Sequence, residues 1–129
     1  MPDYSKLKAL IVDDEPILRM VMSKELESVG IKSAVASTGV EAIQNLKNSR
    51  FDFVLMDISM PDQDGLDAAR WIRDLQDAST NIPIFAVTSY STEEHTAEIL
   101  NAGFNEHFVK PFDLQKLLVV LDKYFWAGK

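Results

Sequence analysis

Five short apolar runs alternate with five segments of helical periodicity, and this alternation limits the possible folds more than any other feature of the sequence. The apolar runs, which we interpret as strands, cover residues 8–12, 32–36, 53–57, 82–87 and 106–109. Strands that are separated by helices must run parallel, and a parallel sheet is covered by helices on both faces. With right-handed crossovers, the pattern predicts an α/β fold with a single open, doubly wound, parallel sheet.

Each helical segment follows a residue that commonly starts a helix. The first helix is expected to run from Pro16 to about Val29, before Gly30. The second should run from a capping box formed by Thr38 and Glu41 to about Asn48. The last three helices are expected to start at Gly65, after Ser91 and Thr92, and after Asp113.

The composition fits one globular domain over residues 1–129, with 47% hydrophobic and 26% charged residues. Its 13 Lys+Arg and 20 Asp+Glu give a formal net charge of -7, which disfavours direct nucleic-acid binding. The absence of cysteine excludes disulfides, thiolate zinc sites and cysteine nucleophiles. No apolar run suits a membrane span and the first residues do not form a signal peptide, so we expect a cytoplasmic protein without membrane insertion.

Polar residues follow four of the predicted strands, at the edge where ligands bind to open parallel sheets. They are Asp13 and Asp14, Asp57, Thr88 and Lys110. Two carboxylates about 4 Å apart repel by roughly 4 kcal/mol at an effective dielectric constant of about 20, so such a group takes up protons or binds a cation. Oxygen ligands with space for water suit Mg²⁺. The alternative is that the acidic residues only serve helix starts.

A carboxylate beside a divalent cation and an ammonium group is suited to attack a phosphoryl group. The cation can neutralise one phosphoryl oxygen, Lys110 a second, and the Thr88 hydroxyl with backbone N–H groups a third. Lys110 could instead lie in a solvated loop, and Thr88 alone is a weak signal.

Together these motifs resemble the response-regulator receiver domain of two-component signalling, over nearly the whole chain. The resemblance is carried by Asp13-Asp14, by Asp57 within Met56–Pro61, by Asp64-Gly65, by Thr88 after Ala86-Val87, and by Lys110-Pro111-Phe112. It implies a flavodoxin-like sheet of five strands in the order 2-1-3-4-5.

The resemblance also implies the role of each residue. Asp57 would be the phosphoacceptor, and Asp13, Asp14, Asp57 and the backbone carbonyl of Ser59 would surround Mg²⁺. Thr88 and Lys110 would bind the phosphoryl group, and the Lys110-Pro111 bond would be cis. The phosphoryl group would come from a histidine kinase or a histidine phosphotransfer protein. Such a domain is a switch that catalyses only its own phosphorylation and dephosphorylation.

One position departs from the family pattern, because His107 stands where the family usually has a Tyr or Phe switch residue. The departure puts the aromatic switch in doubt, and His107 could simply be a partly exposed strand residue. On the first helix, Ile17 and Met20 fall outside the core stripe and Val21 lies at its edge. All three are predicted to dock a phosphodonor helix. Tyr90 is predicted to favour a long-lived phosphoryl group.

Two other classes of protein share parts of this pattern. A flavin-binding electron carrier would need a phosphate-binding loop after the first strand, where Asp13-Asp14-Glu15 would repel a phosphate. A phosphatase with an aspartyl nucleophile would commonly place that residue on the first strand. The sequence also leaves open a stand-alone receiver and the receiver of a hybrid kinase or larger regulator.

Overall fold

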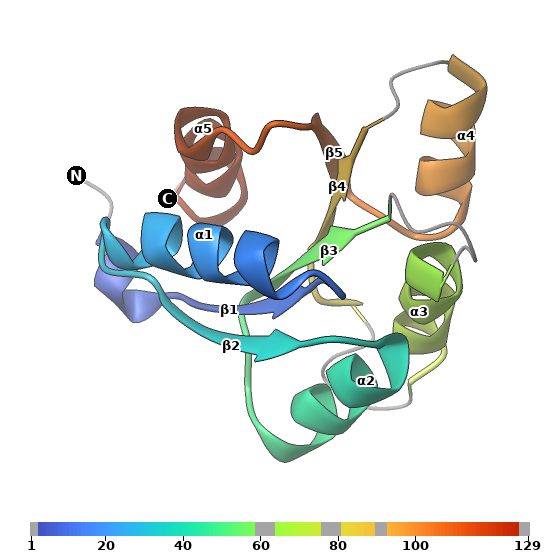
Figure 1. Cartoon of the computed structure of the whole chain (residues 1–129), viewed down its shortest axis with the longest axis horizontal. Coiled ribbons are helices and arrows are strands. Elements are labelled where there is room, and N and C mark those ends of the chain that lie inside the picture. The colour runs from blue at the N-terminus through green and yellow to red at the C-terminus, as the bar shows by residue number, and fades with distance from the viewer. Residues whose placement is uncertain (1–2, 59–63, 76–80, 90–92, 127–129) are drawn as a thin grey trace.

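The computed structural model describes residues 3–58, 64–75, 81–89 and 93–126 (Figure 1). The strands are β1 (Lys8–Val12), β2 (Lys32–Ala36), β3 (Phe53–Asp57), β4 (Ile84–Thr88) and β5 (Glu106–Val109). The helices are α1 (Pro16–Glu27), α2 (Gly39–Asn48), α3 (Asp64–Arg73), α4 (Glu93–Asn101) and α5 (Leu114–Phe125), preceded by the short 3₁₀ helix η1 (Tyr4–Lys6).

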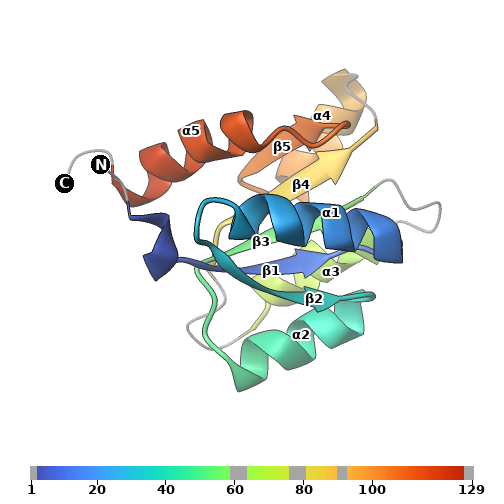
Figure 2. The same ribbon diagram turned by 60° about the vertical axis from the view of Figure 1, so that its left-hand side comes forward.

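All five strands run parallel in the order β2-β1-β3-β4-β5, which confirms the predicted fold class and topology. Helices α1 and α5 cover one face of the sheet, and α2, α3 and α4 lie on the other (Figures 1 and 2). The central strands β3 and β4 are buried along their whole length, which explains why their sequences are continuous apolar runs.

Alternate residues of the central strands enter two separate hydrophobic cores. Phe53 and Leu55 pack in one core with Leu26 of α1 and Leu117 of α5. The neighbouring residues of β3 point to the opposite face, into a core shared with α2, α3 and α4. The sheet therefore separates two apolar layers.

Several element boundaries differ from the prediction by one or two residues, among them the start of α3 at Asp64 and the end of β4 at Thr88. Helix α1 ends at Glu27 because the N–H groups of Val29 and Gly30 bond to carbonyls only three residues back, at 3.1 and 2.9 Å. Strand β4 begins at Ile84 and not at Ile82, since Pro83 has no N–H for the ladder. The N–H of Ile84 is instead the first donor, to the side chain of Asn105 at 2.8 Å.

The predicted caps of two helices are confirmed. The Thr38 hydroxyl accepts the N–H of Glu41 at 3.1 Å, and the Asp113 carboxylate accepts the N–H groups of Gln115 and Lys116. In a capping box, the Glu41 carboxylate would accept the backbone N–H of Thr38. In the structure this carboxylate accepts a hydrogen bond from the hydroxyl of Ser37. The predicted Ser91-Thr92 cap lies outside the described residues.

Arg73, at the end of α3, joins three segments through its guanidinium group. It donates to the carbonyl of Gly103 at 2.9 and 2.7 Å, to the carbonyl of Ile82 at 2.6 Å, and to the side-chain oxygen of Asn105 at 2.8 Å. Gly103 has a φ of +107°, and a Cβ there would lie 2.8 Å from Cγ of Arg73. The position therefore needs glycine, both for the backbone conformation and for the close approach of Arg73.

Candidate functional site

Three polar side chains are buried within the described parts of the chain, and all three lie at the carboxyl ends of strands. Asp13, Asp57 and Thr88 are exposed by 1%, 1% and 0%. Burying polar groups is costly unless they are bonded or have a ligand. Their position at one edge of the sheet makes this edge the candidate site.

The strand register explains why these residues meet. Val12 of β1 pairs with Met56 of β3, so that Asp13 and Asp57 follow at the same level. Thr88 is one residue beyond Val87, the partner of Asp57 on β4. The N–H of Lys110 donates to the carbonyl of Thr88 at 2.7 Å, which places the start of the β5–α5 connection at this edge.

Lys110 forms the cationic part of the site. Its Nζ lies 3.0 Å from Oδ2 of Asp57, within hydrogen-bonding distance, and its side chain is 21% exposed. The peptide bond from Lys110 to Pro111 is cis, as expected from the resemblance. The ammonium group is thus held beside a buried carboxylate.

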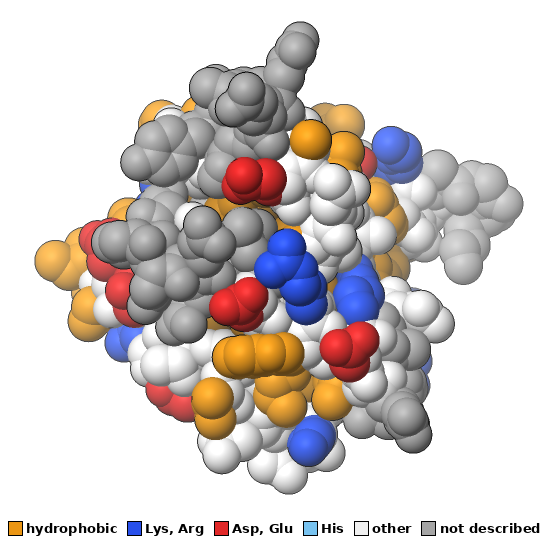
Figure 3. Space-filling model, turned by 90° about the vertical axis from the view of Figure 1, so that its right-hand side faces the viewer, with side chains coloured by type: hydrophobic (Ala, Val, Ile, Leu, Met, Phe, Trp, Pro, Cys, Tyr) orange, Lys and Arg blue, Asp and Glu red, His pale blue; other side chains and the backbone are white. Residues whose placement is uncertain are grey.

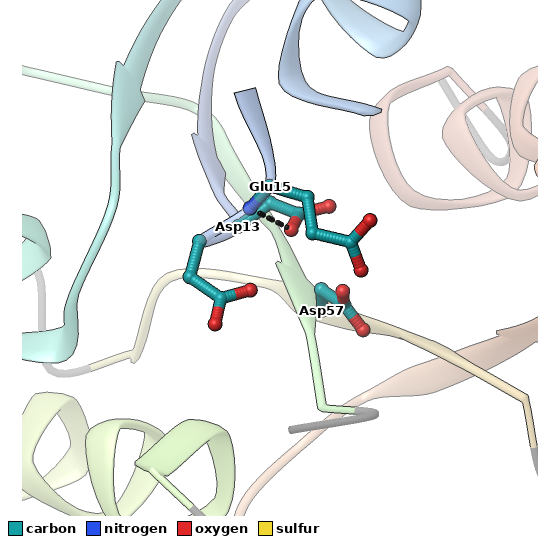
Figure 4. Close-up of side chains that lie close together, drawn as sticks. Asp13, Glu15 and Asp57 are labelled. Carbon is teal, nitrogen blue, oxygen red and sulfur yellow. Dashed lines mark hydrogen bonds between the residues drawn. The ribbon is translucent and has the colours of Figure 1, made fainter. Parts of the chain in front are cut away.

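Four carboxylates gather at this edge, contributed by Asp13, Asp14, Glu15 and Asp57. One oxygen of each lies within 4.8 Å of the others, and Figure 4 shows the side chains of Asp13, Glu15 and Asp57. The buried pair Asp13–Asp57 repels by at least roughly 3 kcal/mol at an effective dielectric constant of about 20. Asp14 and Glu15 are exposed and add less, because water and salt screen them. With one lysine against four acids, the site can hold a divalent cation.

Asp13 is the most constrained member of the cluster. Its Oδ1 accepts the N–H of Glu15 at 2.9 Å, whereas its buried Oδ2 has no hydrogen-bond partner in the described part of the molecule. Burial, together with the negative charge of Asp57, raises the pKa of Asp13 to about 6, and the Glu15 N–H and Lys110 partly oppose this. A buried, unpaired carboxylate oxygen facing other carboxylates fits a metal ligand.

Figure 3 shows the face of the molecule toward which the strands point, with acidic and basic side chains near its centre.

Glu15 belongs to the acidic cluster but was not assigned to the site from the sequence. Its position beside Asp14 was the available signal, but adjacency alone does not show where an exposed side chain points.

Three further residues were predicted from the sequence to act at or near the site: His107, Ser59 and Tyr90. His107 lies on β5 opposite Ala86 and is partly exposed. The backbone of Ser59, predicted to bind the metal, and the side chain of Tyr90 are not among the described residues. Their predicted roles stay predictions.

The predicted docking residues lie on the surface of α1. Ile17, Met20 and Val21 are 71%, 51% and 45% exposed. Val21 also lines a groove of about 430 Å³ that reaches from Phe112 to Asp13 and Lys110. The structure therefore brings Val21 to a groove that ends at the site, with Ile17 and Met20 on the same helix.

Comparison with known proteins gives a consistent result. A family model described as the response regulator receiver domain matches residues 9–122. Two-component response regulator 24 of Arabidopsis thaliana is 35% identical over 120 residues, which cover 92% of this chain and 84% of that protein. Hybrid signal transduction histidine kinase G of Dictyostelium discoideum is 33% identical over 121 residues, which cover 92% of this chain.

Solved structures agree with the sequence matches. The receiver domain of a sensor histidine kinase of Pseudomonas aeruginosa, with a magnesium ion coordinated in its active site cleft, superposes with a TM-score of 0.81 at 30% identity. That match covers 92% of this chain and 96% of the other. The chemotaxis response regulator CheY4 of Vibrio cholerae gives 0.79 at 29% identity, covering 91% and 97%.

The relatives differ greatly in length. The chain spans 4% of the Dictyostelium kinase and 16% of a probable histidine kinase of Oryza sativa.

Within the described residues, no helix is long and apolar enough to cross a membrane.

Proposed function

This chain belongs to the response regulator receiver domain family, and from that premise we propose that Asp57 accepts a phosphoryl group from a phosphohistidine in an Mg²⁺-dependent reaction. The observation that carries the proposal is the position of Asp57. It is buried at the end of β3, 3.0 Å from the ammonium group of Lys110 and within a cluster of carboxylates. Phosphorylation of Asp57 changes the surface that binds partner proteins, and this change is the signal.

The chain's own residues divide the work of phosphoryl transfer. A carboxylate oxygen of Asp57 attacks phosphorus, and the P–N bond to the donor histidine breaks, with its electron pair returning to the imidazole. Lys110 pairs with a phosphoryl oxygen after leaving Asp57, and the Thr88 hydroxyl donates to another. Asp13, Asp14, Asp57 and the Ser59 carbonyl would hold Mg²⁺, which neutralises charge on the reacting oxygens when bound.

We assign the domain the role of a switch and not of a turnover enzyme. Thr88 is buried on β4 and His107 lies on the neighbouring strand β5, which supports a role for both in transmitting a change at Asp57. We also propose that His107 acts as a switch residue. The direct donor is a histidine kinase or a histidine phosphotransfer protein of the cytoplasm, and the output is through protein contacts, without direct binding to nucleic acid.

Incubation with acetyl phosphate and Mg²⁺, followed by intact-mass spectrometry, tests the proposal. One phosphoryl group per chain should appear, and chelation of the metal should prevent it. No adduct in the presence of Mg²⁺ would refute the proposal. Steady release of many phosphates per chain would favour the aspartyl phosphatase, and a coloured, flavin-containing preparation would favour the electron carrier.

The affinity for Mg²⁺ is expected to depend on pH through Asp13, whose pKa is raised to about 6. The metal requires the ionised carboxylate, so the affinity should fall by up to about tenfold per pH unit below pH 6 and level off above pH 7.

The stability of the metal-free protein should change with pH in the opposite direction. Between the ordinary pKa of about 4 and the raised value, the native state binds more protons than the unfolded state, so stability decreases as pH rises.

Calorimetric titration with Mg²⁺ at several pH values checks this expectation, together with thermal unfolding of the metal-free protein. An affinity that stays constant from pH 5 to pH 7 (roughly one unit on either side of the expected pKa) would contradict it.

A charged residue on the exposed part of α1 should impair the protein donor selectively. Ile17→Glu is expected to slow transfer from a phosphorylated histidine phosphotransfer protein by about tenfold, because apolar anchors supply much of the binding energy of such contacts. Phosphorylation by acetyl phosphate should be unchanged, since Ile17 is 71% exposed and does not line the groove that reaches Asp13 and Lys110.

Val119→Glu is the matched control. Val119 is 70% exposed on α5, and its replacement should leave both rates unchanged. An equal loss of both rates in Ile17→Glu would argue against docking through α1.

A further inference from the structure

Glu15 occupies a helix position at which glutamate is not a preferred residue. It is the N-cap residue of α1, where Ser, Thr, Asp and Asn are preferred because their short side chains bond to the helix N–H groups. The Glu15 side chain makes no such bond. Its carboxylate is therefore available for another partner.

The backbone holds Glu15 at the metal site. Its N–H donates to Oδ1 of Asp13 at 2.9 Å, and this bond fixes the turn between β1 and α1. Figure 4 shows the Glu15 carboxylate directed to the same side as that of Asp57. An oxygen of Glu15 lies within 4.8 Å of oxygens of the other three acids.

A second observation, at Asp13, points to a ligand at this cluster. Asp13 is 1% exposed, and its Oδ2 has no hydrogen-bond partner among the described residues. A buried carboxylate oxygen without a donor is costly unless a cation or an ordered water completes its surroundings. Glu15 is exposed while Asp13 is buried, so the Glu15 carboxylate lies on the open side of the cluster.

We propose that Glu15 supplies a fourth carboxylate to the metal site and thereby raises its affinity for larger divalent cations relative to Mg²⁺. This inference rests on the proposed Mg²⁺-dependent function. Mg²⁺ takes one or two carboxylates and keeps several waters, so it gains little from an additional acid. Ca²⁺ accepts six to eight oxygen ligands in flexible geometry and can use the longer side chain of Glu15 directly.

The alternative is that Glu15 only complements the positive end of the α1 dipole. The two roles have opposite consequences for the metal-free protein. Loss of a favourable dipole interaction would lower the melting temperature. Loss of one of four mutually repelling carboxylates would raise it.

The test compares Glu15→Gln with the control Glu27→Gln, which removes one exposed charge from the far end of the same helix. Binding of Mg²⁺ and of Ca²⁺ is measured by calorimetric titration, and thermal unfolding is measured with and without metal. Glu15→Gln should lose about tenfold in affinity for Ca²⁺ and about threefold or less for Mg²⁺. Its metal-free melting temperature should rise by a few degrees, and the control should leave the affinities for both metals unchanged.

Each outcome has a defined meaning. Unchanged affinities for both metals in Glu15→Gln, or equal losses for both, would overturn the proposal. A lowered metal-free melting temperature with unchanged affinities would establish the helix-dipole role. If the wild-type protein bound neither metal, the proposed Mg²⁺-dependent function would fail together with this inference. If the wild-type protein bound Mg²⁺ and Glu15→Gln behaved like it, only the inference about Glu15 would fail.

Discussion

Asp57→Asn is expected to abolish phosphorylation completely, whether the donor is acetyl phosphate or a phosphorylated protein. The substitution keeps the size of the side chain and leaves an amide oxygen as an acceptor for Lys110, which lies 3.0 Å from Oδ2 in the native protein. It removes the negative charge and the nucleophilic carboxylate, which no neutral amide replaces. Intact-mass spectrometry after incubation with donor and Mg²⁺ should show the mass of the unmodified protein.

The matched control is Asp74→Asn, an exposed aspartate that follows α3. It should take up one phosphoryl group at the wild-type rate. The retained secondary structure of Asp57→Asn, measured by circular dichroism, would show that the loss is chemical. If Asp57→Asn were phosphorylated as fast as the wild type, another residue would be the acceptor and the proposed function would be wrong.

Arg73→Met should produce the largest loss of stability among the variants considered. Methionine preserves most of the side-chain volume but removes the guanidinium group, and with it the hydrogen bonds to Gly103, Ile82 and Asn105. The carbonyls of Gly103 and Ile82 then lose charged donors in a partly buried place. A loss of about 3 kcal/mol in the free energy of unfolding follows, which for a domain of this size lowers the melting temperature by about 10 °C.

Arg70→Met provides the comparison, because Arg70 lies one turn earlier on the same helix. Its guanidinium group is 3.2 Å from Asp67, and both side chains are about half exposed, at 52% and 50%. Such an exposed pair contributes less than about 1 kcal/mol, so thermal or urea unfolding should barely change. Equal effects of the two substitutions would show that the Arg73 contacts do not anchor the structure.

Much of the fold and of the site could be predicted because strands and their ends have clear local signals. The apolar run that ends at Asp57 is short and is followed by turn residues, as is typical of a buried strand, and a parallel sheet brings the ends of its strands to one edge. The meeting of Asp13, Asp57 and Lys110 follows from this geometry without any knowledge of side-chain conformation.

The features that escaped prediction depend on contacts between distant residues. Arg73 looks like a solvent-exposed position on a helix, and its partners at Gly103 and Asn105 come together only in the folded chain. Similarly, Gly39 starts α2, but its packing role is visible only in space. A Cβ at Gly39 would lie 2.8 Å from Cβ of Ala68 on α3, so glycine is what permits the close approach of the two helices.

The division of the interior by the sheet has a consequence for how such a domain can change. Val54 and Met56 contact one apolar layer and Phe53 and Leu55 the other, with the backbone of β3 between them. Compensating substitutions need to occur only within a layer, because side chains on opposite sides of the sheet do not share a packing environment. The half that carries α1 and α5 could therefore be redesigned for a new partner while the half beneath α2, α3 and α4 keeps its native residues.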